Sequence, residues 1–154
     1  MRRARVGVEI RRVNDGPILI CYDGSTGAEH AIATAAGLLG PRRAVVLDVG
    51  PVQEDVALGS EALAFEEMER ELTTAQAQSG AELARNAGFH ARRCADIEAP
   101  AWLGAVEVAD EIGADAIVVG PRGLCGVKAL LESSFSRLVA IHADRPVLVV
   151  PPPN

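Results

Sequence analysis

Short apolar segments alternate with helical stretches along almost the whole chain. Each segment is too short for a helix and rich in branched residues, which is typical of strands buried in a sheet. The strands are expected at 17–22, 44–49, 89–97, 115–120 and 146–150. The helices are expected at 28–39, 61–87, 101–112 and 134–142. Such alternation predicts an α/β fold: one open, five-stranded parallel sheet with helices on both faces.

Two of these elements carry further expectations. Arg92 and Arg93 interrupt the third strand, which favours a position at the edge of the sheet. Ser25 and Thr26 can cap the first helix, and Thr26 with Glu29 matches a capping box. The long second helix is rich in acids, and its apolar stripe is expected to face the core. The residues of that stripe are Leu63, Phe65, Met68, Leu72, Ala75 and Leu83.

Composition limits the class of protein. A chain of 154 residues with 49% hydrophobic residues suits one globular domain, which we place at 17–154. The net charge of −6 disfavours nonspecific binding to nucleic acid or to an anionic membrane. Three sparse cysteines and no clustered Cys/His pattern favour reduced thiols in a cytoplasmic protein without a structural zinc site.

The first sixteen residues have a different character from the domain. Five arginines lie there, and Val6, Val8 and Ile10 alternate with other residues. We expect residues 1–16 to be a flexible tail. The alternative is an added edge strand or a segment that pairs with a partner.

The richest chemistry follows the fourth strand. The strand ends at Gly120, a loop with Gly123 and Arg122 follows, and Ser133 and Ser134 open the last helix. Glycines let backbone N–H groups approach an anion, and a helix start favours negative charge, so this layout suits a phosphate. The alternative is an ordinary connection that uses glycines for turns.

This segment resembles the nucleotide motif of the universal stress protein family, Gly-x2-Gly-x9-Gly-Ser/Thr. Gly120, Gly123 and Ser134 match, whereas Ser133 stands in place of the third glycine. The segments 21–25 and 145–150 also fit, and the resemblance covers roughly residues 17–151. It implies a Rossmann-like sheet with strand order 3-2-1-4-5. Ligands of such sheets bind where the winding reverses, here between strands one and four.

The resemblance implies that the ligand is ATP, with or without Mg²⁺, or AMP or another adenine nucleotide. Adenine and ribose would lie against the ends of strands one, two and four, and phosphates against the last loop and helix. The residues that the resemblance places around the nucleotide are Cys21, Tyr22, Asp23, Val49, Val119, Gly120, Arg122, Gly123, Ser133, Ser134, Phe135 and Ser136. Ser133, Glu132 and Glu98 depart from the family pattern and oppose binding of an anion.

Three functions remain open at this point. The first is a cytoplasmic stress-response protein that holds the nucleotide as a regulatory ligand, because the sequence shows no nucleophile elbow and no Walker motif for catalysis. The second is a nucleotide-free member of the family that acts as a dimeric interaction module. The third is an adenylating or flavin-linked enzyme. The resemblance also implies a homodimer through strand five, whose apolar edge is Val147, Leu148, Val149 and Val150.

Overall fold

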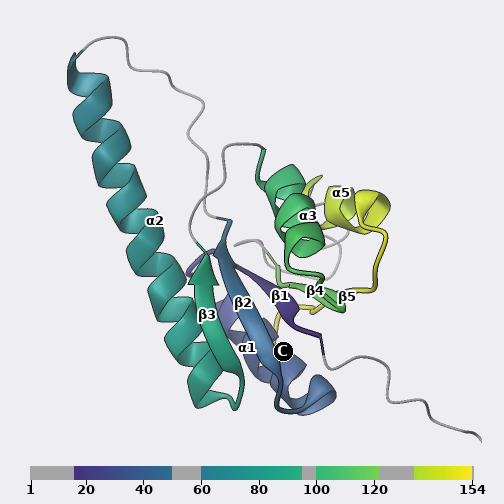
Figure 1. The fold of residues 1–154 in the computed structure, drawn as a ribbon. Coiled ribbons are helices and arrows are strands. Elements are labelled where there is room, and N and C mark those ends of the chain that lie inside the picture. Colours follow the sequence, from purple (N-terminus) through teal and green to yellow (C-terminus); the bar gives the residue numbers. More distant parts are fainter. Residues whose placement is uncertain (1–15, 50–59, 95–99, 122–133, 154) are drawn as a thin grey trace, which may run out of the picture.

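A computed structural model describes residues 16–49, 60–94, 100–121 and 134–153 of the chain. These residues form five strands and four helices around one parallel sheet (Figure 1). The strands are β1 (Ile18–Tyr22), β2 (Arg43–Asp48), β3 (His90–Cys94), β4 (Ala116–Val119) and β5 (Val147–Val149). The helices are α1 (Thr26–Leu39), α2 (Ser60–Asn86), α3 (Ala101–Glu111) and α5 (Ser134–His142). The strand order is β3-β2-β1-β4-β5, which confirms the predicted order.

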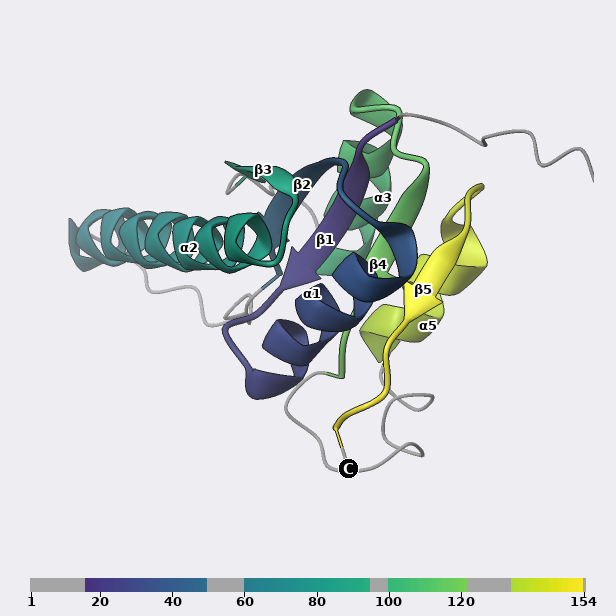
Figure 2. The same ribbon diagram turned by 90° about the horizontal axis from the view of Figure 1, so that it is seen from below.

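Each face of the sheet packs against two helices, as the strand pattern predicts. Ile18 and Ile20 of β1 belong to the core on the side of α1 and α2, whereas Leu19 and Cys21 belong to the core on the side of α3 and α5. Figure 2 shows α1 and α3 on opposite sides of β1. Because successive side chains of a strand point to opposite faces, a strand covered on both sides reads as a continuous apolar run.

The third strand lies at the edge of the sheet, as its two arginines predict. Arg92 and Arg93 are exposed, whereas Ala91 is buried between the sheet and α2. The side chain of Arg85 donates from Nε to the Ala91 carbonyl oxygen over 2.9 Å. This bond occupies part of the open edge, so β3 is a poor template for pairing with another strand.

The start of α1 differs from the predicted capping box. Ser25 is the N-cap: its backbone is extended, with φ −79° and ψ 157°, and its hydroxyl accepts from the Ala28 N–H over 3.2 Å. Thr26 is already the first helical residue. The box pairs a cap with an acid three residues later, and the third residue after Ser25 is alanine, so the reciprocal bond has no side chain to form it.

The prediction of a core-facing stripe on α2 is wrong at Met68, Leu72 and Ala75, whereas the side chains of Leu63 and Phe65 lie outside the described part of the structure. Met68 is 50% exposed, Leu72 is 62% exposed, and Ala75 is also exposed. The residues of α2 that are buried lie in its second half: Ala77, Gly80, Ala81 and Ala84. A helix of 27 residues is about 40 Å long, roughly twice the length of the strands beside it. The first half therefore extends past the sheet (Figure 1).

One arginine ties the end of α3 to the start of β5. Arg145 donates from Nη1 to the carbonyl oxygens of Ala109, over 2.9 Å, and Ala114, over 2.6 Å. Its Nη2 pairs with the carboxylates of Asp110 and Asp144. Arg145 thus bonds one carbonyl in the last turn of α3 and one in the segment between α3 and β4, and it holds both against the start of β5. Within the described ranges, none of the helices has the length and apolar character needed to cross a membrane.

The packing of α2 against β1 generates a test on two helical glycines. A Cβ at Gly80 would lie 2.7 Å from the Tyr22 ring and 2.9 Å from a Val46 methyl, whereas a Cβ at Gly37 of α1 would have no atom within 4 Å. We expect Gly80→Ala to lower the free energy of unfolding by about 1–3 kcal/mol, because it overpacks the core. Gly37→Ala should raise it by about 0.4–1 kcal/mol. Urea unfolding followed by far-UV circular dichroism measures both, and equal stability of the two variants would contradict this packing.

Candidate functional site

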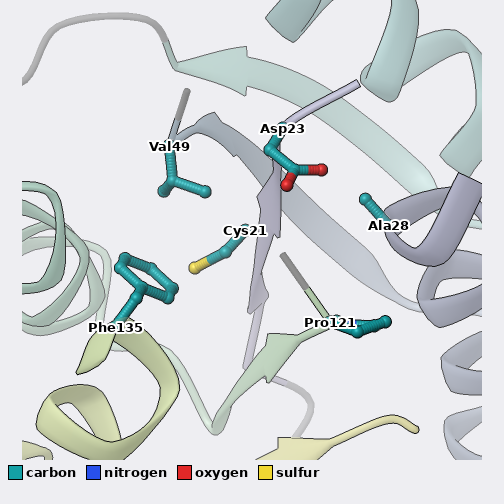
Figure 3. A pocket seen from close by; sticks show the side chains of 7 residues that line it. Cys21, Asp23, Ala28, Val49, Pro121 and Phe135 are labelled. Carbon is teal, nitrogen blue, oxygen red and sulfur yellow. The ribbon is translucent and has the colours of Figure 1, made fainter. Parts of the chain in front are cut away.

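A small cavity lies at the carboxyl ends of β1 and β4, where the winding of the sheet reverses (Figure 3). Residues from the ends of β1, β2 and β4 and from the first turns of α1 and α5 meet there. The lining residues are Cys21, Asp23, Ala28, Val49, Gly120, Pro121 and Phe135. In an open parallel sheet this crevice is the usual place for a ligand.

Two glycines allow the walls of the cavity to approach each other. A Cβ at Gly27 would lie 2.5 Å from the Pro121 ring, and a Cβ at Gly120 would lie 2.9 Å from the Gly27 carbonyl oxygen. Real Cβ atoms essentially never come so close to another heavy atom. The absence of both Cβ atoms therefore lets the start of α1 lie directly against the end of β4.

The carboxylate of Asp23 is held at the end of β1 by the residue that caps α1. Its Oδ1 accepts from the Ser25 N–H over 3.0 Å and from the Ser25 hydroxyl over 2.5 Å. Asx turns of this kind stabilise the bend after a strand. Asp23 thus presents a positioned negative charge to the cavity, beside the backbone of Gly24, whose φ is +77°.

The cavity is nearly filled by protein atoms. Its volume is about 10 Å³, which is room for about one water molecule. Phe135 is only 5% exposed, and its ring lies beside the Cys21 thiol and faces Val49 (Figure 3). The described part of the site therefore has the polar groups of a binding cleft but not the open space of one.

The structure brings together some of the residues that the sequence assigns to the site. Cys21, Asp23, Val49, Gly120 and Phe135 line the cavity. The Val49 N–H donates to the Tyr22 carbonyl oxygen over 2.9 Å, which extends the pairing of β2 with β1.

The other described site residues do not line this cavity. Tyr22 packs in the core on the side of α1 and α2, and Val119 is fully buried in the opposite core. Ser134 is the first residue of α5, and Ser136 is buried. Arg122, Gly123 and Ser133 lie outside the described residues, as do Glu98 and Glu132.

Sequence reasoning missed three contributors to this end of the sheet. Ala28 and Pro121 line the cavity. Asp48, at the end of β2, is only 4% exposed, and its Oδ1 accepts from Gln76 Nε2 of α2 over 3.2 Å. The available signal for Asp48 was an acid inside an otherwise apolar run, because a buried carboxylate needs a partner.

Negative charges gather around Tyr22. Burial raises the pKa of its hydroxyl above the ordinary value of 10.0, and the charges of Glu29, Asp23 and Asp48 raise the pKa further. The acids at this end of the sheet come from three segments, yet among the described residues no group of three or more His, Cys, Asp or Glu side chains could hold a metal ion.

Comparisons with known proteins give a consistent result. The model of the universal stress protein family matches residues 16–151. Among solved structures, the hypothetical protein MJ0577 is 26% identical, with a TM-score of 0.63 over 90% of this chain and 97% of that one. A universal stress protein in complex with cAMP is 23% identical, with a TM-score of 0.57 over 88% and 96%. No curated protein matches the chain.

A more distant structure shares the same fold. It is a universal stress protein family protein from Arabidopsis thaliana with AMP bound, 14% identical to this chain. Its TM-score is 0.62, and the match covers 90% of this chain and 92% of that one. The architecture is thus retained where little sequence identity remains.

The surroundings of Tyr22 predict how stability depends on pH. A hydroxyl whose pKa is raised by folding holds its proton more tightly in the folded chain. Its contribution to stability is therefore complete below pH 10 and is lost as pH rises through the pKa of the folded state. We expect the free energy of unfolding to fall more steeply above pH 10 in the wild type than in Tyr22→Phe. Because Tyr22 is the single tyrosine, phenolate absorbance reports its titration directly, and a midpoint at or below 10 would contradict this reading.

Proposed function

The chain belongs to the universal stress protein family, and from that premise we propose that its cleft between β1 and β4 binds an adenine nucleotide as a regulatory ligand. Two structures of the same architecture support the ligand class, since one is in complex with cAMP and the other has AMP bound. In this chain we propose ATP, with or without Mg²⁺, as the first ligand to test, and AMP as the second.

The observation that carries the proposal is the meeting of Asp23 with Gly120 in one cavity, although about a hundred residues separate them in the sequence. A carboxylate accepts from hydroxyls, so Asp23 would bind the ribose. Its Oδ1 already accepts from Ser25, so Oδ2 would accept from the ribose. Cys21 and Val49 would contact the flat faces of the purine.

Phosphates would lie at the start of α5. A helix start offers backbone N–H groups and favours negative charge. Ser134 is the first residue of this helix, and Ser136 follows two positions later. In this arrangement the nucleotide spans from the end of β2 to α5, with no side chain assigned to attack or to proton transfer. The proposal is therefore a ligand-binding protein in which hydrolysis is slow or absent.

A second candidate is a nucleotide-free module that acts through protein contacts. The observation that favours it is the cavity of about 10 Å³, which is too small for a purine with Phe135 in its present position. The nucleotide-binding and the nucleotide-free protein would therefore differ in whether the Phe135 ring can leave the cavity. We propose that either version works in the stress response of the cytoplasm.

We also propose a homodimer through the edge of β5. Val147, Leu148 and Val149 are all half-buried, and β5 pairs with β4 on one side only. The Val150 N–H donates to the Val119 carbonyl oxygen, and the Ile117 N–H donates to the Pro146 carbonyl oxygen. The backbone N–H and C=O groups of the even-numbered residues around β5 therefore point toward β4. Because the backbone groups of successive residues in a strand point to opposite sides, those of Val147 and Val149 point toward the open edge.

Titration calorimetry with ATP, AMP and cAMP tests the ligand. We expect binding by the wild type and roughly tenfold weaker binding by Asp23→Asn, a loss of about 1.4 kcal/mol from one bond to a charged group. Asparagine keeps the turn with Ser25, so the variant removes charge and not local structure. Asp144→Asn, on an exposed acid beside β5, is the matched control. An absence of heat at millimolar concentrations of all three nucleotides would remove the proposal and favour the nucleotide-free module.

The dimer has its own test. Val149→Pro deletes an N–H on the open side of β5 and leaves the bonds to β4 intact, because proline is tolerated at the outer edge of a sheet. We expect analytical ultracentrifugation to show half the mass of the wild type, with an unchanged circular dichroism spectrum. A wild-type monomer, or a Val149→Pro protein of unchanged mass, would place any assembly elsewhere on the surface.

A further inference from the structure

We infer that Phe135 is a plug that closes the cleft and decides whether it admits a purine. The closure itself stands on the geometry of the described residues alone. Its consequence for the ligand rests on the proposed function, because only a nucleotide brings a base to this place.

The position of the ring is the first argument. Phe135 is the second residue of α5, so its backbone lies at the helix start where phosphates would bind. Its ring lies beside the Cys21 thiol and faces Val49, on the side of the sheet covered by α3 and α5 (Figure 3). The remaining space holds about one water molecule. A phenyl ring and a purine are both flat and largely apolar, and one such space cannot hold both.

The surroundings of the ring explain why it stays closed. Phe135 belongs to the core that also contains Leu47, Ala105 and Val139, and all three are fully buried. Moving the ring into water would forfeit this burial, so the closed state is favoured without a ligand. Val139, one turn further along α5, fixes the helix to the sheet. Opening therefore needs a change in the first turn of α5 and not a shift of the whole helix.

This arrangement predicts a particular pattern of selectivity. A nucleotide has to expel the ring and loses the corresponding part of its affinity, since ligand binding pays for any shift between two states. Inorganic triphosphate has no base, so it can bind while the Phe135 ring stays in the cavity. Removing the ring should therefore tighten binding of ATP and AMP and leave triphosphate unchanged. Stacking of the base on Phe135 would give the opposite result.

The first experiment compares the wild type with Phe135→Val and Phe135→Leu by titration calorimetry. We expect Phe135→Val to bind ATP and AMP at least tenfold more tightly than the wild type, with Phe135→Leu between them and triphosphate equal in all three. Val139→Ala is the matched control, because it shortens another buried side chain of α5 that does not line the cavity. Fluorescence of the single tryptophan, Trp102, confirms that each variant is folded.

The second experiment measures closure without any nucleotide. Cys21 is buried, 3% exposed, and lines the cavity together with Phe135. Its reaction with N-ethylmaleimide, resolved from the other cysteines by peptide mass spectrometry, reports access to the cleft. We expect at least tenfold faster labelling of Cys21 in Phe135→Val than in the wild type, a rate near that of the wild type in Val139→Ala, and protection of Phe135→Val by AMP.

The two experiments separate closure of the cavity by Phe135 from binding of a nucleotide. Equal labelling of Cys21 in the wild type and Phe135→Val overturns the plug. So does binding of ATP by the wild type that is as tight as, or tighter than, binding by Phe135→Val, and that result leaves the nucleotide function intact. Faster labelling of Phe135→Val, with no nucleotide bound by any variant, supports the plug and overturns the nucleotide function.

Discussion

The two glycines at the crossing of α1 and β4 are the constraint on which the site depends. Their missing side chains let the start of a helix and the end of a strand meet at backbone distance, since a Cβ at either one would fall within 3 Å of the other segment. The contact brings the end of β1 beside the end of β4. Asp23 and Gly120 share one cavity as a result, and the bond from Ser25 to Asp23 joins the start of α1 to the same place.

Much of the fold could be predicted from local pattern. Branched apolar runs mark the strands, and Arg92 and Arg93 place β3 at the edge, because charged side chains are tolerated there. The α2 stripe shows where this reasoning ends. The spacing of Met68 and Leu72 tells which side of a helix is apolar, but only the lengths of the neighbouring strands decide how far the sheet reaches. The close packing is made instead by Ala77, Ala81 and Ala84, whose small side chains carry little periodic signal.

Some residues of the candidate site could also be predicted from the sequence, and others could not. Asp23, Cys21 and Gly120 were predictable because the ends of parallel strands converge. The side chain of Tyr22 points to the opposite face of the sheet from that of Cys21, because neighbours in a strand alternate, so Tyr22 does not line the cavity. The direction of the Phe135 ring was not predictable. A rotamer and the space it occupies depend on side chains from four other segments, and sequence spacing carries no information about volume.

The first half of α2 has a consequence for the whole molecule. Met68 and Leu72, two of its large apolar side chains, are exposed, whereas three alanines of the second half are fully buried: Ala77, Ala81 and Ala84. A helix in a protein gains most of its stability from packing one face against the rest of the molecule. The buried alanines therefore anchor α2 to the sheet, and we expect local opening of this helix to begin at exposed turns such as that of Leu72.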